Sequence, residues 1–123
     1  MLPFTKHISS DPVYENSTYI RLLCIEMERY NIIDNQQRLQ FQVSLKGETA
    51  FLEYRLQEGA IVLMHTEVPE DLGGHGIGTA LAAFAFQYAK DHQLKVKVYC
   101  PFVKKYLDRH PEFKAIVIPP PAL

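Results

Sequence analysis

Four of the six glycines in this 123-residue chain, Gly73, Gly74, Gly76 and Gly78, lie within one six-residue window. The residues before this window, 60–67, are mostly apolar and predict a buried strand, whereas those after it repeat apolar side chains at helical spacing. A glycine-rich turn between a strand and a helix leaves the first helical amides open to an anion. The window therefore predicts a phosphate-binding loop, and the simpler alternative is a tight connecting turn.

Three segments before the glycines predict an antiparallel meander. A polar stretch, 34–37, predicts a turn, and the alternation of apolar and polar side chains through 38–45 predicts a half-buried strand. Short glycine-containing links then lead to predicted strands at 49–56 and 60–67. The last strand is apolar on both faces, so we expect neighbouring strands on both of its sides.

The chain after the glycines predicts a βαβ unit. Apolar residues at helical spacing indicate a helix over 76–92, and residues 95–99 indicate a short strand. Because a helix separates the two strands, we expect them to be parallel, with a right-handed crossover. A further helix over 101–110 and a last strand over 115–118 complete an α+β fold with a mixed sheet.

The length of the chain suits one domain, which we expect to span residues 1–123. Within it, 33–118 form the predicted core and 1–32 a variable N-terminal extension. The extension comprises an irregular segment, 1–16, and an amphipathic helix over 17–30 that begins near a possible cap.

Composition and motif spacing exclude several classes of protein. The net charge of −1 lacks the positive surface of a nucleic-acid binder, and no apolar run reaches the roughly 18 residues of a membrane span. Cys24 and Cys100 lie far apart without a CxxC pattern, and the histidines lack a spacing such as HExxH. We therefore expect no nucleic acid, membrane or metal as partner, and a reducing, cytoplasmic compartment.

Two common nucleotide-binding motifs do not fit the glycine window. A Walker loop requires Lys and then Ser or Thr after its last glycine, but Thr79 and Ala80 follow Gly78. A dinucleotide fingerprint beginning at Gly74 would require glycine in place of Thr79, and it would follow a βαβ unit rather than a meander.

The glycine loop ending Gly76-Ile77-Gly78, set between the meander and a helix, resembles that of the GNAT N-acetyltransferases. His-Thr-Glu-Val-Pro at 65–69 and Cys-Pro-Phe-Val-Lys-Lys-Tyr-Leu-Asp-Arg-His-Pro-Glu at 100–112 are similar to a compact branch of that superfamily whose substrates are uncharacterised. The resemblance covers about 33–118 and implies a GNAT-like mixed sheet that binds acetyl-CoA as cosubstrate.

The resemblance also implies which residues bind the cofactor: Val68, Gly73, Gly74, His75, Gly76, Ile77, Gly78, Thr79 and Lys104. The loop would cradle the pyrophosphate, and Lys104 would meet the 3′-phosphate unless it only belongs to a solvated helix face. The family often has Gln or Arg where this chain has Gly73, so that side-chain contact is missing or is supplied by His75.

Two side chains near the end of strand 60–67 are candidate bases. Alternation places Ile61, Leu63, His65 and Glu67 on one face of the strand. A lysine-like amine has a pKa near 10.4, so neutralising it at pH 7 requires about 4.6 kcal/mol and favours a nearby base. Glu67 is the preferred general base and His65 the second, and the alternative is a cross-strand pair or a solvated strand end.

Cys100 and Tyr106 are the other catalytic candidates. Cys100 follows the strand expected beside the cofactor, and three roles are open: a buried small residue, an acid for the departing CoA thiolate, or a nucleophile that forms an acetyl-enzyme. The resemblance implies that Tyr106 is an acid for the thiolate, and the alternative is packing against Phe102.

We therefore expect an enzyme that transfers acetyl from acetyl-CoA directly to an amine in a ternary complex. The amine would be a small molecule, a protein lysine or an N-terminus, and the protein a monomer or homodimer. The alternatives are ping-pong transfer through Cys100 and a non-catalytic module that binds acyl-CoA or another phosphate ligand.

Overall fold

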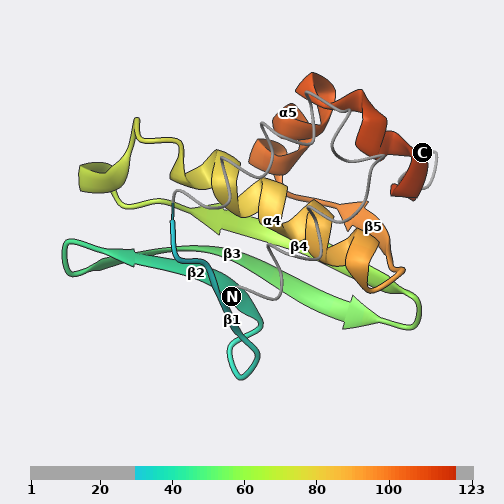
Figure 1. Cartoon of the computed structure of the whole chain (residues 1–123), viewed down its shortest axis with the longest axis horizontal. Coiled ribbons are helices and arrows are strands. Elements are labelled where there is room, and N and C mark those ends of the chain that lie inside the picture. The colour runs from blue at the N-terminus through green and yellow to red at the C-terminus, as the bar shows by residue number, and fades with distance from the viewer. Residues whose placement is uncertain (1–29, 119–123) are drawn as a thin grey trace, which may run out of the picture.

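The computed structural model describes residues 30–118, which form one five-stranded sheet with helices packed on it (Figure 1). The strand order follows the chain, β1-β2-β3-β4-β5. Neighbouring strands are antiparallel from β1 to β4, and β4 and β5 are parallel. The elements are β1 (Ile33–Asn35), β2 (Gln40–Leu45), β3 (Glu48–Gln57), β4 (Ala60–Glu67), η1 (Glu70–Leu72), α4 (Ile77–Asp91), β5 (Lys95–Val98), α5 (Pro101–Arg109) and η2 (Pro111–Ile116).

The predicted α+β fold with a meander and a βαβ unit is confirmed. Lys46 and Gly47, which connect β2 to β3, have φ values of 55° and 78°. Two successive positive φ values are typical of a tight hairpin turn that matches the strand twist. β4 has β3 on one side and β5 on the other, as its apolar run predicts.

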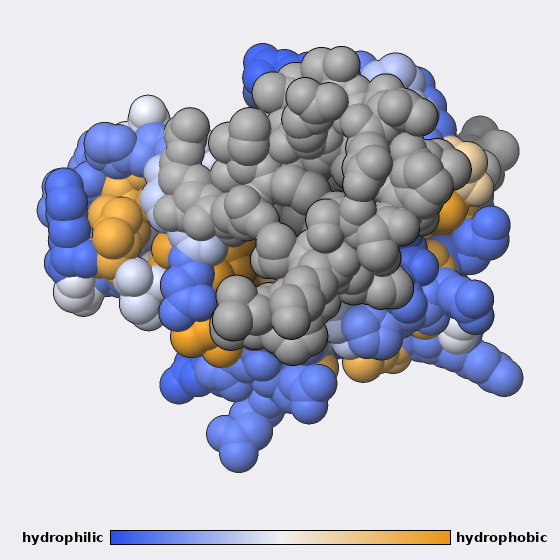
Figure 2. Space-filling view, viewed as in Figure 1, coloured by the Kyte–Doolittle hydropathy of each residue, from blue (hydrophilic) through white to orange (hydrophobic). Residues whose placement is uncertain are grey.

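α4 covers one face of the sheet, and the core lies between them. Alanines of α4, among them Ala82 and Ala85, are fully buried, and small side chains allow the helix backbone to approach the strands closely. The ring of Phe41 on β2 stacks on Tyr54 with centroids 4.5 Å apart and meets Phe84 of α4 at 5.1 Å. On the face seen in Figure 2, hydrophilic residues dominate the described surface, and hydrophobic ones appear in separate patches.

Two elements differ from prediction at the ends of the core. Asp34 and Asn35, predicted as part of a turn, belong to β1, which pairs antiparallel with β2. This edge strand is too short to show a period in the sequence. The predicted last strand, 115–118, is wrong apart from one bridge between Val117 and Val96, because η2 occupies its first half and three prolines without N–H donors follow.

A β-bulge in β4 also corrects the predicted alternation. Glu53 of β3 pairs with His65, but the next residue, Tyr54, pairs with Leu63, so Met64 is an extra residue. A bulge exchanges the faces of all side chains beyond it. His65 and Glu67 therefore share a face with each other, but the prediction that Ile61 and Leu63 lie on that same face is wrong.

The predictions for 1–16 and for a helix over 17–30 lie outside the described residues, apart from Tyr30. Among the helices of residues 30–118, none has the length and apolar character needed to cross a membrane.

Tyr54 connects the core to β1. It is 1% exposed, and its hydroxyl donates a hydrogen bond to Oδ1 of Asp34 at 2.6 Å. Tyr54→Phe is expected to lower the free energy of unfolding by about 1.5–3 kcal/mol at pH 7, because hydrogen bonds to charged groups contribute that much. Urea denaturation followed by circular dichroism measures this loss, and an unchanged midpoint would contradict it.

The same contact predicts a pH dependence. Burial, and then the hydrogen bond and charge of Asp34, raise the pKa of Tyr54 above its ordinary value of 10.0. Since the folded state retains the proton, its stabilisation is complete below pH 10 and is lost as pH rises through the folded pKa. Burial also raises the pKa of Tyr88, so the test is the difference in alkaline stability between wild type and Tyr54→Phe. We expect that difference to shrink above pH 10.

Candidate active site

The pairing between β4 and β5 ends before β4 does, and we call the region beyond the last pair the gap. The paired residues are 60–63 and 95–98, and the amide of Tyr99 donates to the carbonyl of Leu63 at 2.9 Å. Beyond this bond β4 continues to Glu67, whereas the segment after β5 leaves the sheet and begins α5 at Pro101. Within the described part of the chain, the last residues of β4 have no strand on this side. Such an edge can hydrogen-bond an extended ligand through its backbone.

The N-terminus of α4 lies at the end of the loop that follows β4. Its N-cap, Gly76, has a φ of 77°, and no described side chain caps the helix. The first intrahelical bond in this turn joins the amide of Ala80 to the carbonyl of Gly76 at 2.9 Å. The amides of Ile77, Gly78 and Thr79 therefore have no intrahelical acceptor, and the helix dipole adds a partial positive charge. This end of α4 suits an anion.

The structure divides the four glycines into different roles. Gly74 and Gly76 have φ values of 79° and 77°, which favour glycine. Gly73 is extended, and its amide donates to the carbonyl of Glu70 at 3.1 Å, so it closes η1. Gly78 is buried, and a Cβ there would lie 2.6 Å from Cζ of Phe102. Of the four, therefore, only Gly74 and Gly76 are glycine because the backbone of the loop requires a positive φ.

Other residues expected at the cofactor lie in this loop, directly after β4 and on α5. The carbonyl of His75 accepts a hydrogen bond from the hydroxyl of Tyr30, a contact between the start of the described chain and the loop. Val68 is partly buried and packs on the core. The side chain of Lys104 is exposed on α5, and its backbone amide donates to the carbonyl of Cys100.

His65 and Glu67 come together on one face of β4. Nε2 of His65 lies 3.1 Å from Oε1 of Glu67, and the two side chains are 57% and 62% exposed. The ring of Phe51 on β3 meets that of His65 edge-on at 6.2 Å. The pair is thus accessible to a substrate, while its orientation is restricted by a mutual contact.

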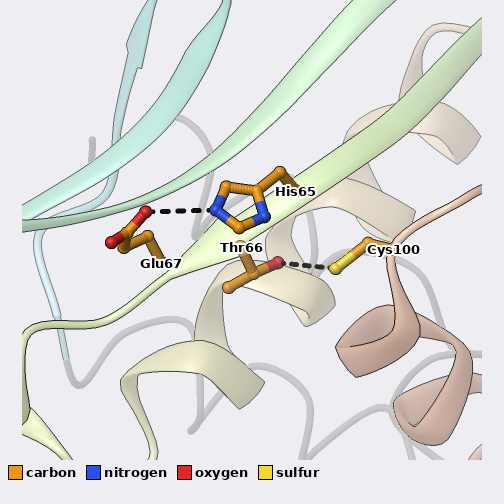
Figure 3. A network of polar contacts seen from close by, with 4 residues as sticks. All are labelled: His65, Thr66, Glu67 and Cys100. Carbon is orange, nitrogen blue, oxygen red and sulfur yellow. Dashed lines mark hydrogen bonds and ion pairs between the residues drawn. The ribbon is translucent and has the colours of Figure 1, made fainter.

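Thr66 and Cys100 face each other on the other side of β4 (Figure 3). The Thr66 hydroxyl lies 3.3 Å from Sγ of Cys100, which is the N-cap of α5 and is 2% exposed. The contact spans the gap between β4 and the beginning of α5. Sequence reasoning missed Thr66, although strand alternation directs its side chain away from those of His65 and Glu67.

The fold and these contacts agree with comparisons to known proteins. The sequence profile of the GCN5-related N-acetyl-transferase family matches residues 40–116, which lie inside the predicted core. The chain belongs to this family.

The chain is also similar to two curated relatives and to one solved structure. Protein NATD1 of mouse is 38% identical over 80 residues, which cover 63% of this chain and 73% of the relative. Protein NATD1 of zebrafish, Danio rerio, is 30% identical over 86 residues, covering 68% and 78%. The NMR solution structure of a GCN5-like protein from Staphylococcus aureus covers 77% of this chain and 94% of its own, with a TM-score of 0.59 and 23% identity. That likeness shows the fold alone.

Tyr106, the acid implied by the resemblance to GNAT proteins, lies in the core of this GCN5-related domain. It is 4% exposed, and its ring stacks on His110 at 4.1 Å and on Phe86 of α4 at 5.9 Å. Among the described residues, its ring contacts are with these two rings and with Phe113, and Phe102 is not one of them. The packing role gains support, and the acid role stays a prediction.

No three His, Cys, Asp or Glu side chains of residues 30–118 gather as a metal site would require. The polar groups that this GCN5-related domain places around the gap are backbone amides, one carboxylate with its histidine, a hydroxyl and a thiol. Such groups bind phosphate and move protons.

Proposed function

We propose that this chain transfers an acetyl group from acetyl-CoA directly to an amine, in a complex that holds both substrates. The observation that carries the proposal is that the gap between β4 and β5 lies beside the N-terminus of α4, which no described side chain caps. Membership of the GCN5-related N-acetyl-transferase family supports the same reaction class.

The gap and the glycine loop suit the two parts of CoA. The amides at the start of α4, with Gly74, His75 and Gly76, would hold the pyrophosphate, since charge-assisted hydrogen bonds contribute about 1.5–3 kcal/mol each. The unpaired edge of β4, continuing to Val68, would bond the amides of the pantetheine arm. Lys104 is an exposed cation on α5 and is our candidate for the 3′-phosphate. Because residue 73 is glycine, it offers no side chain to the pyrophosphate, which backbone groups would then bind.

The two proton transfers, from the amine and to the thiolate, take place on opposite faces of β4. The acceptor amine approaches on the face of Glu67, which takes the amine proton directly or through His65. The amine nitrogen forms a bond to the thioester carbonyl carbon, and the carbon–sulfur bond breaks. The departing thiolate takes a proton on the other face, where Cys100 is the first candidate donor and Tyr106 the second.

Direct transfer is favoured over an acetyl-Cys100 intermediate by burial. At 2% exposure, Sγ of Cys100 presents little surface for bonding to a thioester carbon, whereas the Thr66 hydroxyl that it contacts can relay its proton to the thiolate. The acceptor, the oligomeric state and the cytoplasmic setting stay predictions.

Calorimetry with CoA, and then thiol release from acetyl-CoA across a panel of amines and peptides, tests the proposal. Binding of CoA together with amine-dependent thiol release supports it. Binding without release would support the alternative of a non-catalytic acyl-CoA module, and absence of binding at millimolar CoA would overturn both.

The role of Cys100 has its own test. Cys100→Ala is expected to slow amine-dependent thiol release by ~100-fold, the scale of a lost proton donor. Cys100→Ser, which retains a donor beside Thr66, should retain more activity. Mass spectrometry of wild type after incubation with acetyl-CoA should show no added acetyl group. An acetyl mass on Cys100 that hydroxylamine removes would instead establish the ping-pong route.

A further inference from the structure

Phe102 connects the two helix N-termini at the gap. It lies in the first turn of α5, and its ring rests on Gly78 in the first turn of α4. An added Cβ on Gly78 would meet three atoms of that ring at 2.6, 3.0 and 3.3 Å. Because glycine is less favourable than alanine inside a helix, the residue type at 78 is explained by the space that the ring occupies.

Phe102 remains partly accessible beside Gly78. Phe102 is 42% exposed, although its contact with Gly78 fixes where it lies. Two residues earlier, Cys100 contacts Thr66 across the gap, so the turn that carries Phe102 adjoins the end of β4. Two more exposed apolar side chains border the last β4–β5 pair, Met64 at 36% and Tyr99 at 56%.

The chemistry of a CoA thioester requires a surface of this kind. The nucleotide end of CoA is charged, whereas the pantetheine arm carries methyl and methylene groups that gain from contact with an apolar wall. The backbone edge of β4 can satisfy the amides of the arm but offers no apolar surface to its methyl groups. A fixed, half-exposed aromatic ring between the phosphate site and Cys100 supplies one.

We propose that Phe102, held in place by Gly78, is a cofactor-binding residue that packs against the pantetheine arm and so positions the thioester in the gap. This inference rests on the proposed function, because it requires that CoA binds between β4 and β5. It adds a recognition element for the arm, distinct from the backbone amides that would hold the phosphates.

Two ligands distinguish the arm from the nucleotide: CoA and its nucleotide portion, 3′-phosphoadenosine 5′-diphosphate. Phe102→Ala is expected to weaken CoA binding at least tenfold in calorimetry and to leave binding of the nucleotide unchanged. Leu56→Ala removes another apolar side chain, 52% exposed on β3, and should change neither affinity. Equal losses for both ligands, or no loss for CoA, would overturn the inference.

A variant at Gly78 tests how the ring is held. Gly78→Ala should displace Phe102 and weaken CoA binding as much as Phe102→Ala does, with a lower melting temperature. In the double variant we expect no further loss of CoA affinity and a recovered melting temperature, because the clash is gone. Additive losses in CoA affinity would contradict the coupling. If the wild-type protein binds neither ligand, the proposed function itself fails. If the wild-type protein binds CoA and Phe102→Ala binds it equally well, only the inference about Phe102 fails.

Discussion

Glu67→Gln is expected to slow acetyl transfer by ~100-fold or more while leaving the affinity for CoA unchanged, because loss of a positioned general base has an effect of 10²–10⁴. The carboxylate is exposed, contacts Nε2 of His65, and lies on the opposite face of β4 from the Thr66–Cys100 pair. Gln retains the shape but cannot take a proton at neutral pH. Steady-state thiol release measures the rate, and calorimetry measures CoA binding.

A matched control comes from the same face of the sheet. Glu53 pairs with His65 across the strands, but its carboxylate forms an ion pair with Arg55 at 3.0 Å. Glu53→Gln should change the rate by less than threefold, since exposed ion pairs contribute only about 0–1 kcal/mol. Equal effects of the two substitutions would show a general electrostatic influence and would contradict the assignment of Glu67 as base.

Gly76→Ala is expected to weaken CoA binding at least tenfold. Its φ of 77° is a conformation that residues with a Cβ adopt at a cost of roughly 1–2 kcal/mol, and the strain would act on the amides of the first turn of α4. Titration calorimetry with CoA, at one ionic strength, gives the affinity.

Gly59→Ala separates this effect from general backbone strain. Gly59 has a φ of 73° and no atom within 4 Å of an added Cβ, but it lies in the turn before β4, at the opposite end of that strand. Both variants should lose similar stability in urea denaturation, and only Gly76→Ala should lose affinity. If Gly59→Ala weakens CoA binding equally, the glycine loop is not the phosphate site.

Periodic elements could be predicted from the sequence because their physics is local. The alternation that ends at Leu45, the glycine links and the helical repeat of Ile77 and Leu81 each report on nearby residues, and the structure places strands, turns and α4 accordingly. The parallel pairing of β4 and β5 could be predicted because a helix lies between the two strands in the sequence.

The remaining features depend on contacts between distant residues. A run of apolar residues through Met64 contains no sign of the bulge that separates His65 from the face of Leu63, because the bulge shows only against β3. Likewise, the glycine at 78 looks like part of a phosphate loop until Phe102 is found against it. Thr66 can be recognised as a site residue only from the structure, which places Cys100 opposite it.

The strand order, identical to the order along the chain, has a consequence for how the protein folds. β2, β3 and β4 each pair with the strand before them through a short connection, so these pairings close small loops and form rapidly. Among the pairings of these five strands, only that of β4 with β5 spans an intervening helix, α4, so it closes a longer loop. The gap lies at that junction, so we expect the active site to be completed last, after the meander has already formed.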